Sequence, residues 1–130
     1  PLSLSVGEQR RVAIAAVLAG EPAVVTLDEP TAGLGRPDER RLGEHLSALD
    51  ATVLFSTHEA DFAYEFADRI AVMVGGEVVR TGPPGVVFTD EELLEEACVQ
   101  VPGLVDWARR RGDDEPPKDF ESALETAREG

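Results

Sequence analysis

The stretch VVTLDEP at residues 24–30 decides the fold class of this chain. An apolar run of this length, bounded by Pro22 and Pro30, predicts a short strand that is buried on both faces. Two adjacent carboxylates, Asp28 and Glu29, stand at its carboxyl end, where open parallel sheets bind their ligands. Buried carboxylates are costly unless they are paired or bound to a metal, so a site in which Asp28 helps to hold Mg²⁺ and Glu29 acts on water is one interpretation. The run alone leaves open the alternative, a strand that ends in a solvated loop.

A helix with an anion-binding start precedes this strand. In the stretch LSVGEQRRVAIA at residues 4–15, Ser5 and Glu8 form a capping-box pattern, which predicts a helix over residues 5–19. Free backbone N–H groups, a hydroxyl and Gly7 at its start are suited to a negatively charged ligand. The second half of the helix is almost wholly apolar, which predicts that it is buried beyond its polar start.

A second strand and a histidine follow. Residues 52–56, TVLFS, are apolar and end just before Thr57 and His58. At the carboxyl end of a parallel neighbour, His58 would reach the same crevice as Asp28 and Glu29. The alternation of strands and helices over the first two-thirds of the chain predicts an α/β fold with a mostly parallel sheet.

These three segments, in this order, resemble the second half of an ABC-family ATPase domain. Residues 5–8 resemble the signature loop, usually LSGGQ or LSGGE; residues 24–29 resemble the Walker B strand; and His58 resembles the switch histidine. The resemblance continues through residues 68–73, 75–79 and 82–84. Residues 8–15 and the tail after Phe88 are most similar to the ATPase subunits of energy-coupling-factor importers, which take up cobalt, nickel or vitamins.

The resemblance implies the C-terminal part of a P-loop NTPase domain over residues 1–88 and a small, acidic helical extension over residues 89–130. The chain starts at Pro1 and contains no G-x-x-x-x-G-K-[ST] phosphate loop, the Walker A motif. We therefore expect a fragment that is inactive by itself and leaves apolar strand surface uncovered.

The resemblance also implies the roles of the site residues, with ATP and Mg²⁺ as cofactors. Glu29 would polarise the attacking water, His58 would contact the γ-phosphate, and Asp28 would hold Mg²⁺ through water. The residues facing the γ-phosphate bound on the opposite subunit would be Ser5, Gly7 and Glu8. Val6 and Arg36 depart from the usual glycine and proline, and Gly35 replaces the aspartate that links the two sites.

The implied function is ATP hydrolysis that powers import of a metal ion or a vitamin at the cytoplasmic face of the cell membrane. The implied partners are a second ATPase subunit, identical or different, and separate transmembrane subunits. Two alternatives stay open. One is a non-catalytic partner that completes a neighbour's ATP site, which Gly35 favours. The other is a chromosome-maintenance or repair ATPase, which the charge and the tail disfavour.

The net charge of the chain limits the classes of partner that it can bind. The formal net charge is −14 and Lys118 is the only lysine, which argues against nucleic acid as a partner. Such acidity favours a halophilic source over an ordinary acidic protein, because dense carboxylates keep a protein soluble in high salt. The arginines at 109–111 suit a helix end better than a phosphate patch.

The rest of the sequence predicts individual turns, helix caps and the burial of single residues. Gly75 and Gly76 predict a hairpin turn between strands at 70–74 and 77–81. Asp90 predicts a helix cap, and Cys98, the only cysteine, is expected to be a small buried side chain. We interpret His45 as a surface residue. A final helix carries an apolar stripe that must pack on the domain or on a second copy: Phe120, Ala123, Leu124 and Ala127.

Overall fold

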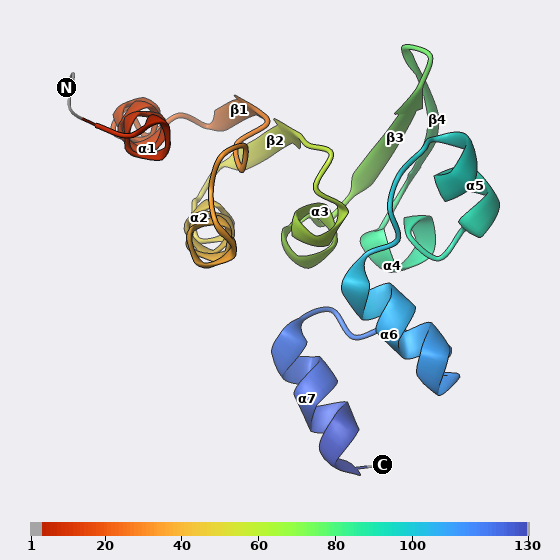
Figure 1. Cartoon of the computed structure of the whole chain (residues 1–130). Helices are drawn as coiled ribbons and strands as arrows, with labels where there is room; N and C mark the ends of the chain where they lie inside the picture. The colour runs from red at the N-terminus through yellow and green to blue at the C-terminus, as the bar shows by residue number, and fades with distance from the viewer. Residues whose placement is uncertain (1–3, 130) are drawn as a thin grey trace. The chain divides into compact units, whose positions relative to one another are not determined.

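The computed structural model describes residues 4–129. The chain divides into two compact units, residues 1–58 and 59–130. The first unit contains helix α1 (Val6–Leu18), strand β1 (Val24–Asp28), helix α2 (Arg36–Ser47) and strand β2 (Thr52–Ser56), as Figure 1 shows. This order, with a helix between two strands, confirms the predicted α/β class.

The two strands of the first unit are parallel. Val24 stands opposite Thr52 at one end of the ladder, and Asp28 stands opposite Ser56 at the other. Beyond the strands, the Glu29 N–H donates to the Ser56 carbonyl oxygen at 3.0 Å. Both strands therefore end at the same edge of the sheet, where the sequence predicts the site.

Helix α1 begins as its sequence predicts, and α2 begins in a different way. Ser5 caps α1 in a complete capping box with Glu8, and α1 ends at Leu18. Helix α2 has a proline in its first turn, where the missing N–H is harmless, but Gly35 gives it no side-chain cap. The acids Asp38 and Glu39 lie in that first turn and complement the helix dipole.

The predicted burial of β1 and α1 is wrong. Val25 is buried, but its neighbour Val24 is 61% exposed, because β1 pairs with β2 alone and only one face of this two-stranded sheet is covered. In α1, Val12 is 58% exposed, and Ile14 is only half-buried. The expectation that apolar strand surface stays uncovered is confirmed by Val24.

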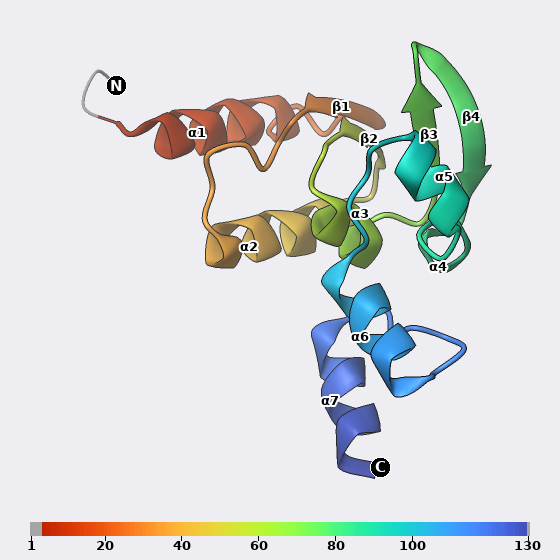
Figure 2. The ribbon, with the colours of Figure 1, turned by 45° about the vertical axis from the view of Figure 1, so that its right-hand side comes forward.

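The second unit starts with helix α3 (Ala60–Phe66) and a hairpin of strands β3 (Ile70–Val74) and β4 (Glu77–Gly82). The strands are antiparallel and meet at Gly75 and Gly76, whose φ angles are +60° and +89°. Two successive positive φ angles are what a two-residue hairpin turn of the predicted kind requires. Figure 2 shows the two strands of this hairpin side by side.

Four short helices follow the hairpin: α4 (Pro84–Val87), α5 (Glu91–Glu96), α6 (Gly103–Arg111) and α7 (Phe120–Glu129). Val72 of β3, Val87 of α4 and Leu93 of α5 form the buried centre of this unit. Helix α4, which the sequence analysis did not predict, lies beside β4 (Figures 1 and 2). A Cβ on Gly82 would lie 3.3 Å from the Val87 side chain, so the small residue allows this close packing.

The C-terminal helices are joined to α3 by hydrogen bonds. The Tyr64 hydroxyl lies 3.2 Å from the Pro116 carbonyl oxygen and 3.0 Å from the Pro117 carbonyl oxygen, and its one hydrogen is shared between these acceptors. The Gly103 N–H, at the start of α6, donates to Asp61 Oδ1 at 2.7 Å. The boundary at residue 88 between ATPase domain and extension stays a prediction.

The arginines at the end of α6 each face a carboxylate. The pairs are Arg109 with Glu91 at 3.0 Å, Arg110 with Asp106 at 2.8 Å, and Arg111 with Asp113 at 3.1 Å. Because each guanidinium already has an anionic partner, the arrangement favours the helix-end role over a phosphate patch. Asp90 accepts from the Leu93 N–H at 3.2 Å and so caps α5, as predicted.

The expectation for Cys98 is wrong, since its side chain is exposed. Helix α5 ends at Glu96, and Cys98 follows in a left-handed conformation with φ of +53°, so it is not on the buried face of that helix. His45 is exposed, as expected. On α7, Ala123 is buried whereas Phe120 and Leu124 are exposed. None of the helices in residues 4–129 is long and apolar enough to cross a bilayer.

Candidate functional site

The carboxyl ends of β1 and β2 bring Glu29 and His58 together. Glu29 Oε2 lies 2.9 Å from His58 Nδ1. The His58 side chain is 73% exposed and the Glu29 side chain 34% exposed, so the pair lies at the surface with the carboxylate as its more covered member. His58 thus lies beside Glu29, and the roles of the three residues stay a prediction. Asp28 is the last residue of β1, directly before Glu29.

Ser56 connects both acids, and the sequence analysis missed it. Its hydroxyl donates a short hydrogen bond to Asp28 Oδ1 and accepts the Glu29 N–H at 3.4 Å. It can do so because the parallel register places Ser56 opposite Asp28. The available signal was a hydroxyl residue at the end of the second strand, just before Thr57 and His58, at the edge where the acids were already expected.

Glu29 has an uncommon backbone conformation. Its φ is +46°, in the left-handed region that residues with a side chain rarely adopt. Hydrogen bonds on both sides maintain it: the Glu29 N–H donates to Ser56, and the Glu29 carbonyl accepts from the Ala32 N–H at 3.1 Å. Strain of this kind persists where the surroundings over-determine it, and it clusters at active sites.

Two side-chain oxygen atoms, one of Glu29 and one of a residue just after it, are buried without a hydrogen bond among the described residues. They are Glu29 Oε2 and Thr31 Oγ1. The approach of His58 Nδ1 to Glu29 Oε2 is close enough for an ion pair, but it lacks the alignment of a hydrogen bond. Thr31 is only 2% exposed. Because buried polar atoms without partners are uncommon, these two mark a place where a water or a ligand oxygen could bind.

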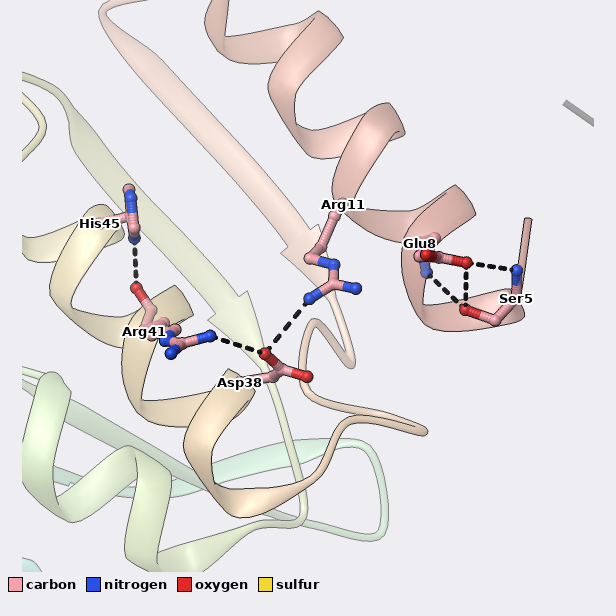
Figure 3. Close-up of polar contacts among 6 residues, drawn as sticks. All are labelled: Ser5, Glu8, Arg11, Asp38, Arg41 and His45. Carbon is pink, nitrogen blue, oxygen red and sulfur yellow. Dashed lines mark hydrogen bonds and ion pairs between the residues drawn. The ribbon is translucent and has the colours of Figure 1, made fainter.

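Ser5, Gly7 and Glu8 form a second cluster at the start of α1. The Ser5 hydroxyl and the Ser5 N–H both donate to Glu8 Oε2 at 2.8 Å, and the Glu8 N–H donates to Ser5 Oγ at 3.3 Å (Figure 3). These bonds from the Ser5 backbone and hydroxyl lower the pKa of Glu8 below its usual value of 4.5. We call residues 5–8 the signature turn.

The signature turn lies near the loop that follows β1. A Cβ on Gly7 would lie 3.4 Å from Leu34 Cδ2, which is ordinary contact distance. Leu34 belongs to the loop of residues 29–35, which begins at Glu29. The first turn of α1 and the acid site are therefore connected through one short loop.

The described residues offer one carboxylate, Asp28, to a magnesium ion but no complete metal site. No group of three or more acids, histidines or cysteines in residues 4–129 is arranged around one point. Mg²⁺ keeps several waters and commonly uses one or two carboxylates together with substrate phosphates, so Asp28 alone suits a water-mediated contact. The 130 residues contain no G-x-x-x-x-G-K-[ST] loop to cradle the phosphates.

Comparisons with known proteins find similarity to ABC transporter ATPases. The family model described as ABC transporter matches residues 1–32. The energy-coupling factor transporter ATP-binding protein EcfA2 of Streptococcus sanguinis is 42% identical over 111 residues, which cover 83% of this chain and 40% of the relative. The protein of the same name from Methanospirillum hungatei is 41% identical over 112 residues, which cover 84% of this chain and 28% of the relative. The chain thus spans about two fifths or less of these relatives.

Solved structures show the same fold. The chain is similar to cbiO1 of Clostridium perfringens, described as part of the ABC transporter complex cbiONQ, with a TM-score of 0.59 and 35% identity over 82% of this chain and 44% of that one. It is also similar to the ADP conformation of an ATP-binding cassette, MJ1267, with a TM-score of 0.64 and 26% identity over 75% of this chain and 41% of that one.

Proposed function

Because this chain belongs to the ABC transporter ATPase family, we propose that it supplies the acid pair, the switch histidine and the signature turn of an ATP-hydrolysing transporter subunit. The single observation that carries the proposal is the meeting of Glu29 and His58 at the carboxyl ends of two parallel strands, 2.9 Å apart. This edge is where open α/β sheets bind ligands.

The chain's own residues have distinct tasks in this proposal. Glu29 accepts a hydrogen bond from the attacking water and orients it; its Oε2, which lies 2.9 Å from His58 Nδ1, has no hydrogen bond among the described residues. His58 lies beside the carboxylate and responds to the terminal phosphate. Asp28, oriented by Ser56, contacts the water shell of Mg²⁺. Bound Mg-ATP supplies the phosphoryl group, and catalysis by such sites is mostly positioning and charge stabilisation.

The signature turn acts on a nucleotide held by a partner subunit. Ser5, Gly7 and Glu8 stand at the N-terminus of a helix of 13 residues, whose backbone N–H groups attract negative charge. The Ser5 hydroxyl is engaged by Glu8 in this structure. Contact with a γ-phosphate therefore requires the hydroxyl to turn from one anion to another, which preserves its hydrogen bond.

The names of the relatives support the proposed partners, whereas the proposed substrate rests on the sequence resemblance alone. The proteins named EcfA2 are energy-coupling factor transporter ATP-binding proteins, and cbiO1 is part of a transporter complex. We therefore propose a second ATPase subunit and separate transmembrane subunits as partners, with the chain bound at the cytoplasmic face of the membrane. Import of cobalt, nickel or a vitamin is the proposed purpose.

A non-catalytic partner subunit is the second candidate, and Gly35 favours it. In the family that position usually carries an aspartate that links the two sites. The intact trio of Asp28, Glu29 and His58 favours catalysis instead.

The deciding experiment is Glu29→Gln in the full-length protein, assembled with its partners. A positioned general base typically contributes about 10²–10⁴-fold, so phosphate release should fall by that factor while ATP binding persists. Glu77→Gln, on the exposed end of the hairpin, is the matched control and should hydrolyse at the parental rate. Unchanged hydrolysis by Glu29→Gln would refute the catalytic role and favour the non-catalytic candidate.

A further inference from the structure

An ion pair joins helix α1, which carries the signature turn, to helix α2. Arg11 lies in the second turn of α1, and Asp38 lies in the first turn of α2. Arg11 NH1 is 3.2 Å from Asp38 Oδ1, in a contact that is both a hydrogen bond and an ion pair (Figure 3). The two residues are 27 positions apart in the chain, so this contact belongs to the tertiary structure.

Asp38 also has a partner within its own helix. Arg41 NH1 approaches the same oxygen, Asp38 Oδ1, at 3.7 Å from one turn further along α2. One carboxylate oxygen thus holds a cation from each helix, as Figure 3 shows. Arg41 is therefore a suitable control, because its contact with Asp38 lies within α2 and does not involve α1.

The loop between Glu29 and Asp38 is a series of hydrogen-bonded turns. The Ala32 N–H donates to the Glu29 carbonyl at 3.1 Å, the Leu34 N–H to the Thr31 carbonyl at 2.9 Å, and the Asp38 N–H to the Gly35 carbonyl at 2.9 Å. These short, hydrogen-bonded turns connect Asp38 with Glu29. Leu34, in the middle of this series, also lies near Gly7.

We propose that Arg11 and Asp38 are positioning residues that fix the signature turn relative to the loop of residues 29–35 within one chain. The proximity of Gly7 to Leu34 limits how closely the signature turn approaches the loop, and the ion pair holds the second turn of α1 near the first turn of α2. The role deepens the proposed function, because it makes the groups that serve a partner's nucleotide move together with the acid that serves the chain's own site.

The exposure of the pair sets the size of the expected effect. The side chain of Arg11 is 51% exposed and that of Asp38 is 36% exposed. Exposed ion pairs contribute little to global stability, so their loss should change local opening by roughly two- to fivefold and leave the fold intact. Positioning, and not stability, is thus the property that the experiment must measure.

The test uses Arg11→Gln, Asp38→Asn and the double variant in the full-length protein, with Arg41→Gln as the matched control. Amide hydrogen exchange is followed by mass spectrometry in peptides that cover residues 4–9, 31–38 and, as a reference, the hairpin at 70–82. Each single variant should speed exchange about two- to fivefold in the first two peptides and not in the hairpin. The double variant should match the single ones, because both remove the same contact. Arg41→Gln should leave residues 4–9 unchanged.

A second readout separates positioning from a merely structural role. Arg11→Gln should lower kcat for ATP hydrolysis with KM for ATP unchanged, and Arg11→Lys, which keeps the charge, should restore most of kcat. Unchanged exchange, additive effects of the two single variants, or faster exchange in all three peptides would overturn the proposal. A parent protein without ATPase activity would contradict the proposed function, while the exchange data would still decide whether the link exists.

Discussion

Glu29 and His58 meet across the ends of two parallel strands, with Glu29 Oε2 2.9 Å from His58 Nδ1. Beneath them, Ser56 joins the strands by accepting the Glu29 N–H and donating to Asp28. The carboxylate that the sequence marks as a base is thus oriented by a backbone with φ of +46° and by a residue that no motif named. Asp28, Glu29, Ser56 and His58 are thus connected by contacts across the two strand ends.

Ser56→Ala should damage the site more than the fold. The change removes the hydrogen bond to the Asp28 carboxylate, and hydrogen bonds to charged groups are worth about 1.5–3 kcal/mol, less where water can replace them. We expect a loss of about 1 kcal/mol of stability and a clear fall in phosphate release by the full-length protein. Thermal unfolding and a phosphate-release assay measure the two effects. Ser47→Ala, at the exposed end of α2, is the control; equal behaviour of the two variants would refute the role of Ser56.

Gly35→Asp should be tolerated and should stabilise α2. Gly35 is the N-cap of α2, with φ of −89°, and a Cβ there would meet only Pro37 Cδ at 3.9 Å, so no strain opposes a side chain. Aspartate is a better N-cap than glycine by a few tenths of a kcal/mol. If the family's aspartate links the two sites, hydrolysis or its cooperativity should also rise. Steady-state kinetics against ATP concentration test this, and a fall in rate with an intact fold would contradict it.

Tyr64→Phe should loosen the segment that the tyrosine holds. The variant loses the hydrogen bond that the hydroxyl shares between the Pro116 and Pro117 carbonyls, worth about 1 kcal/mol in total stability. Limited proteolysis between residues 112 and 117 should be faster, while cleavage in the hairpin stays at the parental rate. Equal cleavage in both proteins would show that the hydroxyl does not hold the segment.

We also expect the ionisation of Tyr64 to lower the stability of the protein at alkaline pH. Burial raises the pKa of Tyr64 above its usual value of 10.0. The unfolded chain therefore ionises first as the pH rises, so the contribution of Tyr64 to stability is complete below pH 10 and is lost as the pH rises toward its folded pKa. Between pH 9 and about 11, the melting temperature should fall less steeply with pH for Tyr64→Phe than for the parent.

Salt should stabilise the protein strongly if its acidity reflects a halophilic source. A net charge of −14 destabilises the compact state through self-repulsion. The screening length is about 10 Å at 0.1 M salt and about 3 Å at 1 M, so molar chloride removes much of that repulsion. Melting temperatures followed by circular dichroism should rise steeply from low to molar sodium or potassium chloride. A melting temperature that does not change with salt would rule out the halophilic interpretation.

The sequence by itself determined the features that depend on neighbours a few residues apart. Ser5 and Glu8 specified the start of α1, Gly75 and Gly76 specified the hairpin turn, and Asp90 specified the cap of α5. Each of these rests on hydrogen bonds or φ angles within about one turn of chain. Asp28 and Glu29 were predicted to lie at the end of a strand, because ligands of open parallel sheets bind at the carboxyl ends of the strands.

Only the tertiary structure decided which distant residues meet. Ser56 reaches Asp28 because of the strand register, across 28 positions, and Arg11 reaches Asp38 across 27. The predicted burial was also wrong at several positions, since Val12 and Val17 of α1 and the side chain of Cys98 are exposed. An apolar pattern states which side chains favour leaving water, but only the elements packed around them determine whether they do.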